Sequence, residues 1–203
     1  MQPFRKLTSL VAPLDRTNVD TDQIIPKQFL KRIERTGYGD YLFFDWRQTP
    51  DGTPVVDFVL NDLRYTGAQI LVAGKNFGCG SSREHAAWAL ENYGFRCVIA
   101  PTFADIFFSN AGKNGILLVK LSEEQVAELL RKAQTIPGYR LTVSLEDQTV
   151  TDGQGFNATF EVDPFRRYCL LEGLDDIGLT LRHVAALDTY ETQHDEASWL
   201  KAK

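Results

Sequence analysis

The chain has 203 residues, of which 43% are hydrophobic and 24% are charged, and its formal net charge is −5. This is the composition of a globular protein that is long enough to bury a core, and it excludes a small scaffold held together by disulfide bonds. Because the Lys and Arg residues form no block, the sequence gives no electrostatic reason to expect nucleic acid or an anionic membrane as a partner.

The first third of the chain, up to about Asn61, combines frequent turn signals with a dense group of aromatic residues. The apolar residues of the segment 1–14 are isolated, so we expect no signal peptide, and no stretch approaches the roughly 20 apolar residues of a membrane span. The recurring prolines and glycines predict short strands and long loops that cover another layer. The aromatic residues are expected in the core or in a subunit interface: Tyr38, Tyr41, Phe43, Phe44 and Trp46.

In the middle of the chain, short apolar runs alternate with segments of helical spacing. We predict strands at 69–73, 97–100 and 116–119, and helices at 81–93, at 103–110 and from residue 122 onward. The last of these helices has the strongest signal, because Ser122 and Gln125 form a capping box in front of an apolar stripe. Strands and helices that alternate in this way favour an α/β layer with parallel strands.

After residue 137 the apolar residues alternate instead of following a helical period. The segments 141–145 and 156–162, with a turn at 151–155 between them, predict a β-hairpin. A helix is predicted over 165–172, because Pro164 suits the first turn of a helix.

The three cysteines, Cys79, Cys97 and Cys169, lie far apart in the sequence and form no Cys-x-x-Cys pair. An odd and unclustered set is typical of a protein of the reducing cytoplasm. Three cysteines can also hold an iron–sulfur cluster with one open iron. The wide spacing favours the other interpretation, in which the cysteines are thiols that pack like small apolar side chains.

The segment 76–85, Asn-Phe-Gly-Cys-Gly-Ser-Ser-Arg-Glu-His, lies where a predicted strand leads into a helix. Ligands of open α/β sheets bind at this edge, and helix N-termini favour anions. Arg83 adds a planar guanidinium that suits a carboxylate or a phosphate. Neither common nucleotide loop fits, because Arg83 stands where the dinucleotide fingerprint needs glycine and a Gly-Lys-Ser/Thr sequence is absent. The segment therefore predicts an anion site in which a serine hydroxyl could act as a base.

A purely structural interpretation accounts for the same residues. Ser81 and Glu84 have the spacing of a capping box, so Ser81 could simply cap the helix. Arg83 could pair with Glu84 or with Asp105 on the surface. The pattern alone does not decide between the two interpretations.

Six segments, spread in order over nearly the whole chain, carry a family resemblance: 18–26, 41–47, 76–85, 99–107, 165–169 and 173–181. They resemble the mobile swivel domain of the aconitase superfamily and, within it, the family of 3-isopropylmalate dehydratase small subunits. The resemblance implies one α/β domain over residues 1–203, of the swivelling β/β/α type. Its mostly parallel sheet would be flanked by helices and followed by a β-hairpin and C-terminal helices, and the polar residues from about 188 to 203 are expected to form a flexible tail.

The resemblance also implies one half of an enzyme, a hydro-lyase that isomerises 2-isopropylmalate and 3-isopropylmalate through 2-isopropylmaleate in leucine biosynthesis. It assigns Ser81 as the catalytic base and Arg83 as the group that binds a substrate carboxylate, with Gly80 and Ser82 as further substrate-binding residues. This chain is expected to bind no cofactor or metal. A [4Fe–4S] cluster that acts as Lewis acid is expected on a separate large subunit.

The segment 26–32 resembles the loop by which members of the superfamily select the variable group of the substrate. Phe29 and Leu30 are apolar and suit an isopropyl group, while Lys31 or Arg32 could meet a carboxylate or water. An ordinary helix start with exposed basic residues is the alternative.

Four other residues are weaker candidates. Asp20 and Asp22 look like paired carboxylates, but Asp in a turn more often accepts hydrogen bonds from the backbone. Arg16 lies near the place where superfamily members carry another substrate-binding arginine. His85 is expected to pack behind the site.

The resemblance leaves other functions open. The same scaffold could act on citraconate and methylmalate, or on homoaconitate, because the shared motif does not separate these substrates. A regulatory or RNA-binding protein built on an aconitase-type domain is an alternative of another class. The net charge of −5 without a basic stripe argues against RNA binding.

Overall fold

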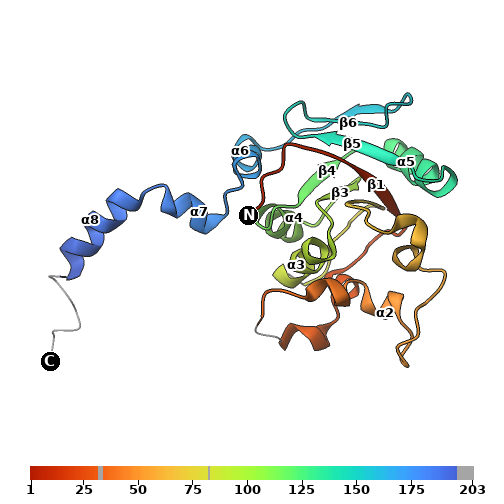
Figure 1. Cartoon of the computed structure of the whole chain (residues 1–203), viewed down its shortest axis with the longest axis horizontal. Coiled ribbons are helices and arrows are strands. Elements are labelled where there is room, and N and C mark those ends of the chain that lie inside the picture. The colour runs from red at the N-terminus through yellow and green to blue at the C-terminus, as the bar shows by residue number, and fades with distance from the viewer. Residues whose placement is uncertain (32–33, 82, 196–203) are drawn as a thin grey trace.

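The computed structural model describes residues 1–31, 34–81 and 83–195, and a seven-stranded sheet runs through them in the order β4-β3-β2-β1-β5-β6-β7 (Figure 1). The parallel half contains β1 (Lys6–Leu14), β2 (Ile70–Ala73), β3 (Cys97–Ala100) and β4 (Leu117–Lys120). The antiparallel half continues from β1 with β5 (Arg140–Ser144), β6 (Thr149–Thr151) and β7 (Asn157–Thr159). The predicted α/β fold is confirmed, and the sheet is mixed, with three parallel and three antiparallel pairings among the described residues.

The helices lie before, between and after the strands. The described α-helices are α1 (Thr21–Ile24), α2 (Phe44–Arg47), α3 (Glu84–Tyr93), α4 (Asp105–Lys113), α5 (Glu123–Thr135), α6 (Pro164–Glu172), α7 (Asp176–Leu181) and α8 (Val184–Asp195). Short 3₁₀ turns fill the N-terminal region: η1 (Lys27–Lys31), η2 (Tyr38–Tyr41), η3 (Val59–Asn61) and η4 (Leu63–Tyr65).

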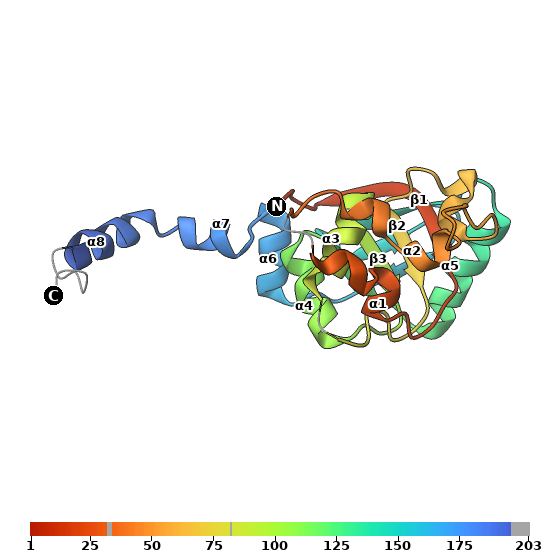
Figure 2. The ribbon, with the colours of Figure 1, turned by 90° about the horizontal axis from the view of Figure 1, so that it is seen from below.

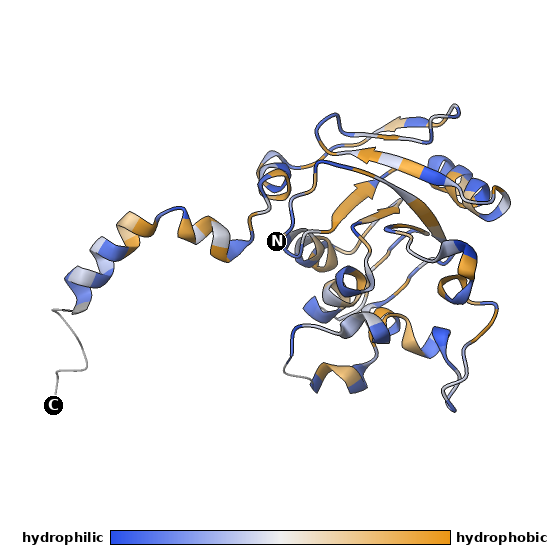
Figure 3. Ribbon diagram, in the orientation of Figure 1, coloured by the Kyte–Doolittle hydropathy of each residue, from blue (hydrophilic) through white to orange (hydrophobic). Residues whose placement is uncertain are grey.

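Two apolar cores lie on opposite faces of the parallel strands, because successive strand residues point to opposite sides. In β2, Leu71 and Ala73 join the first core, whereas Ile70 and Val72 join the second. The first core is covered by α3, α4 and the N-terminal segments, with α1 and α3 in front of the strands in Figure 2. The second core is covered by α5 and the antiparallel strands. Strands buried on both faces are apolar throughout, as the orange strands of Figure 3 show.

Most predicted elements are found within a few residues of their expected positions. The three predicted strands of the parallel layer correspond to β2, β3 and β4, and the capping box of α5 is confirmed, with Gln125 N donating to Ser122 Oγ at 3.2 Å. The predicted hairpin proves to be a three-stranded meander. Its middle strand, β6, is only three residues long and has a single buried residue, so it gives almost no alternation to detect.

The end of the described chain leaves the body of the molecule. After α6, the helices α7 and α8 extend away from the sheet (Figures 1 and 2). Residues 188–195 form the last part of α8, and residues 196–203 of the predicted tail lie outside the described residues. In the described part of the chain no helix is long and apolar enough to cross a membrane.

Candidate active site

The segment that follows β2 is held between two others at the carboxyl edge of the parallel strands. On one side it pairs with the chain after β1, through Asn18 N to Lys75 O at 2.9 Å, Gly78 N to Val19 O at 2.7 Å and Thr21 N to Cys79 O at 2.9 Å. On the other side it pairs with the chain after β3, through Phe77 N to Thr102 O and Ala104 N to Phe77 O, both at 3.1 Å. Backbone hydrogen bonds on both sides therefore fix the predicted site segment at the edge where such sheets bind ligands.

Gly78 shows why the segment needs glycine. Its φ is +77°, and a Cβ there would lie 2.2 Å from the ring of Phe107, which is buried in α4. Any side chain at this position would both strain the backbone and displace the first core. The tight packing brings the chain down to α4 before it turns back to begin α3.

Ser81 does not cap α3. The helix begins at Glu84, its N-cap is Arg83, and no side chain caps it among the described residues. Ser81 is exposed, and its carbonyl accepts a hydrogen bond from Thr21 Oγ1 at 2.6 Å. The capping-box interpretation of Ser81 is therefore wrong, because the pairing with α1 holds this serine outside the helix. Ser81 thus precedes by three residues a helix start that no side chain of the described part of the chain closes.

Arg83 pairs with an acidic residue that sequence spacing did not suggest. Its Nε donates to Asp22 Oδ1 at 2.9 Å, and the other oxygen of Asp22 lies 3.1 Å from Lys27 Nζ. In the structure the ion pair of Arg83 is with Asp22 of α1 instead of Glu84 or Asp105, the partners that the structural interpretation named. Among the described residues, the two terminal nitrogens of Arg83 have no hydrogen-bond partner, which leaves the outer part of the fork for an anion.

The two acidic residues of the first motif have different roles. Asp20 caps α1 in a reciprocal capping box with Gln23, with bonds of 2.8 and 3.0 Å, as the structural interpretation predicted. Asp22 instead neutralises Arg83 and Lys27. One carboxylate thus links the site segment to the beginning of the predicted specificity segment.

The predicted specificity segment is packed onto the aromatic group. The ring of Phe29 stacks on Tyr41 at 4.0 Å and meets the edge of Phe44 at 4.8 Å. Leu30 is half-buried against the first core, and Lys31 is exposed. Of the other predicted binding residues, Gly80 is exposed beside Asp20, whereas Ser82 and Arg32 lie outside the described residues.

His85 and Arg16 both contact tryptophan. The imidazole of His85 lies 4.6 Å from the ring of Trp88 and 5.4 Å from that of Tyr38, and burial holds its pKa below the usual value. His85 therefore packs behind the site, as predicted. The guanidinium of Arg16 lies over Trp46 at 4.3 Å.

The cysteines do not form a metal site. Cys79 is half-buried in the site segment, Cys97 is buried in β3 and Cys169 is buried in α6. Burial raises the pKa of each thiol, which keeps the proton on sulfur and opposes metal ligation. Within the described ranges no three His, Cys, Asp or Glu side chains lie close enough together to hold a metal ion.

Comparisons with known proteins show the family of the chain. The model of the aconitase C-terminal domain matches residues 1–124, a model described as LeuD_N matches 127–164, and the model of the C-terminal domain of the 3-isopropylmalate dehydratase small subunit matches 176–203. A 3-isopropylmalate dehydratase small subunit of Acidobacterium capsulatum is 72% identical over 98% of this chain and 94% of its own length. One of Brevibacillus brevis is 60% identical over 95% of this chain and 100% of its own length.

A solved structure shows the same fold. The 3-isopropylmalate dehydratase (leuD) of Methanocaldococcus jannaschii matches with a TM-score of 0.66 at 23% identity, over 91% of this chain and 99% of that chain. At this identity the likeness concerns the fold alone. The identities to the bacterial relatives extend over nearly the full length, and the site segment lies within the matched aconitase C-terminal domain. The chain therefore belongs to the family of 3-isopropylmalate dehydratase small subunits of the aconitase superfamily.

Proposed function

We propose that this chain is the small subunit of a hydro-lyase that interconverts 2-isopropylmalate and 3-isopropylmalate through 2-isopropylmaleate in leucine biosynthesis. The family membership supports the reaction. The observation that carries the site is the exposed Ser81, three residues before the start of α3, which no side chain of the described residues caps, in a segment whose Arg83 pairs with Asp22 through Nε alone. A base and a carboxylate-binding group are the two functions that this chain must supply.

The chemistry accounts for the residue types. A proton on a carbon next to a carboxylate is weakly acidic, so its removal needs a strong base and fixed positive charge nearby. In the proposal Ser81, as an alkoxide, takes this proton, and the electron pair of the broken C–H bond forms the double bond of 2-isopropylmaleate as the hydroxyl departs. Arg83 and the first N–H groups of α3 stabilise the negative charge that develops on the substrate as the proton leaves. Addition of water in the opposite sense gives 3-isopropylmalate.

The proposed site is incomplete in this chain alone. Ser81 and Gly80 lie on the surface, so water must be excluded by a partner, which we take to be the large subunit. The departing hydroxyl requires a Lewis acid, which in this proposal comes from the [4Fe–4S] cluster of the large subunit. The three free thiols support the proposal that the enzyme acts in the reducing cytoplasm.

Substrate selection is assigned to the segment around η1. Phe29 and Leu30 would offer an apolar surface to the isopropyl group, and Lys31 would meet a carboxylate or water. Both apolar side chains already pack against the body of the protein, so only their outer surfaces are available for this role. A preference for methylmalate or homoaconitate would place selection elsewhere.

The test is reconstitution with the large subunit under anaerobic conditions, followed by measurement of alkene formation from 2-isopropylmalate. We expect the variant Ser81→Ala to lose roughly a thousandfold in kcat, the range of a general base, while it still binds the large subunit. Ser109→Ala in α4 is the matched control and should keep full activity. If the Ser81→Ala enzyme turns over substrate at a near-normal rate, Ser81 has no part in the mechanism. If the assembled wild-type enzyme has an intact cluster and turns over no malate, the proposed function is refuted.

A further inference from the structure

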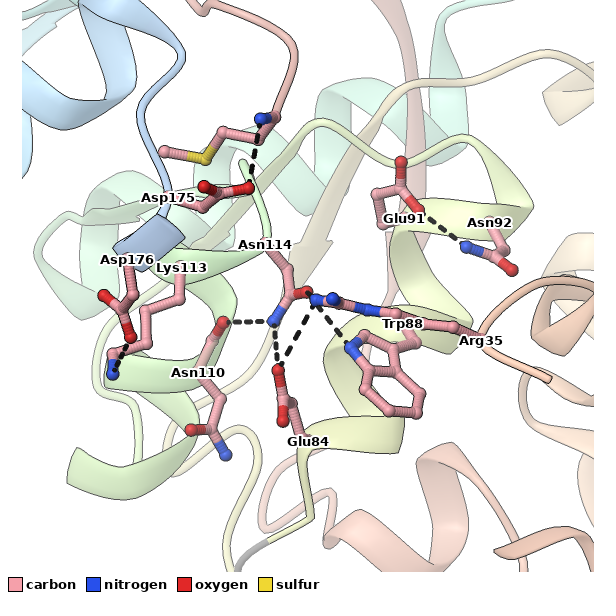
Figure 4. A network of polar contacts seen from close by, with 11 residues as sticks. Arg35, Glu84, Trp88, Glu91, Asn92, Asn110, Lys113, Asn114, Asp175 and Asp176 are labelled. Atoms are coloured by element: carbon pink, nitrogen blue, oxygen red, sulfur yellow. Dashed lines mark hydrogen bonds and ion pairs between the residues drawn. The ribbon is translucent and has the colours of Figure 1, made fainter. Parts of the chain in front are cut away.

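The side-chain amide of Asn114, at the end of α4 and next to the site segment, makes four hydrogen bonds (Figure 4). Asn114 Oδ1 accepts from Arg35 Nη2 at 3.0 Å and from Trp88 Nε1 at 3.1 Å. Asn114 Nδ2 donates to Glu84 Oε1 at 3.3 Å and to the carbonyl of Asn110 at 2.8 Å. A side-chain amide has two donor hydrogens and two acceptor lone pairs, and all four are occupied here.

The amide is anchored on a rigid element. Asn114 is the C-cap of α4, and its backbone N–H bonds to carbonyls of the last turn. Ala111 before it and Ile116 after it are buried in the first core. The neighbouring Lys113 pairs with Asp176 at 2.8 Å, which ties the same helix end to α7. The core therefore fixes the backbone from which the Asn114 side chain reaches its partners.

Arg35 depends on this anchor. Its side chain is 64% exposed, and its distance of 3.7 Å to Glu84 makes an ion pair of the kind that contributes little alone. The guanidinium also lies over the ring of Trp88 at 5.1 Å. Asn114 joins these contacts, because it binds Arg35, Glu84 and Trp88 at once.

Lys27 near the start of the predicted specificity segment and Arg35 shortly after its end are thus tied to consecutive residues of the site. Lys27, at the start, is linked through Asp22 to Arg83. Arg35, three residues beyond the end of the segment, is linked to Glu84 directly and through Asn114. Phe29 and Leu30 are also held by their own packing, so the exposed Lys31 is the residue whose place depends most on these tethers.

We propose that Asn114 is a positioning residue, which through Arg35 and Glu84 sets the place of the specificity segment beside Ser81 and Arg83. The proposal rests on the proposed function, because it assigns the segment to substrate selection. Asn114 touches neither substrate nor the reacting atoms. Its loss should affect substrate binding more than the chemical step.

The first test uses the enzyme assembled with its large subunit. In Asn114→Ala the KM for 2-isopropylmalate should rise about fivefold, the effect of one lost hydrogen bond, while kcat stays within about twofold. Arg35→Ala should give the same rise, and the double variant should show no further rise, because both substitutions break one tether. Asn114→Asp keeps the acceptor oxygen for Arg35 but sets a carboxylate against Glu84, so it should not rescue. Arg131→Ala, an exposed arginine of α5, is the control.

The second test needs neither partner nor substrate. Hydrogen exchange of the Tyr38 backbone amide, which donates to Asn92 Oδ1 at 3.2 Å, should become roughly tenfold faster in both single variants, while α5 keeps its protection. Unchanged exchange at Tyr38 with unchanged KM overturns the proposal, as does a loss of protection throughout the molecule, which would mean a structural role. If the wild-type complex turns over no isopropylmalate, the proposed function fails, and the exchange measurement still decides whether the tether exists.

Discussion

Two serines of the chain, Ser81 and Ser122, each stand three residues before a Glu or Gln at the start of a helix, and they do different things. Ser122 and Gln125 cap α5 reciprocally, with Ser122 N donating to Gln125 Oε1 at 3.0 Å. Ser81 stands three residues before Glu84 in the same way, yet α3 begins at Glu84 and Ser81 remains outside. The difference is tertiary: Thr21 Oγ1 donates to the carbonyl of Ser81, whereas Ser122 caps α5 through its own hydroxyl. A closed helix start is a structural device, and an open one in front of an exposed hydroxyl is available for chemistry.

The largest expected effect is at Gly78, the glycine at which the chain turns before α3. We expect Gly78→Ala to cost roughly 3 kcal/mol of unfolding free energy, because it adds a core clash to a strained φ. Chemical denaturation measures this loss. Gly138→Ala is the control, since its φ is +70° and nothing lies within 4 Å of the added Cβ. An equal loss in the two variants would mean that backbone strain, and not the contact with Phe107, explains the glycine.

The next largest effect is expected at Arg83, the residue directly before α3. Arg83→Gln in the assembled enzyme should lower kcat/KM about a hundredfold, as expected when one partner of a charged hydrogen-bonded pair is removed. Arg83→Lys should recover little, because lysine cannot offer the planar fork. Steady-state kinetics on 2-isopropylmalate checks both variants. Full recovery with lysine would show that only the charge matters.

Near the C-terminal end of α5, the ion pair between Lys132 and Asp152 makes the stability of the protein depend on pH. Burial alone would raise the pKa of Asp152, but Lys132 of α5, Tyr139 and backbone N–H groups donate to its carboxylate and lower the pKa to about 2. Folding therefore favours the charged form. The stabilisation is complete above the usual carboxyl pKa, near about 4, and is lost as the pH falls toward 2.

Asp152→Asn should thus cost about 2 kcal/mol at pH 7 and flatten the acid limb of the stability curve. Urea unfolding at a series of pH values measures both effects. Asp188→Asn, on the exposed α8, should leave the curve unchanged. An unaltered acid limb in Asp152→Asn would assign acid unfolding to other carboxylates.

The smallest effect separates the two serines directly. Ser122→Ala should lose about 1 kcal/mol of stability, the usual value of an N-cap, and keep full activity. Ser81→Ala should keep the stability of the wild type, because its side chain caps nothing. Thermal unfolding of both variants tests this, and a lower melting temperature for Ser81→Ala would contradict the open helix start.

The sequence predicts this fold well where interactions are local. Buried runs such as Ile70–Ala73 and the amphipathic stripe of α5 carry their own periodicity, and the capping box at Ser122 needs only neighbouring residues. The site is predicted by its segment but not by its pairings. Arg83 meets Asp22 across 61 positions, and a local pattern that suggests Glu84 cannot show this. The same holds for Asn114, whose partners come from three separate segments.

The place of β1 in the sheet has a consequence for how the chain is made. β1 pairs with β2 on one side and with β5 on the other, so residues 6–14 are needed by both halves of the sheet. During synthesis this strand leaves the ribosome first, yet its antiparallel partner follows more than a hundred residues later. At typical translation speeds the edge stays unpaired for on the order of ten seconds. The strand that organises the finished domain is thus the one that a nascent chain must protect longest from other chains.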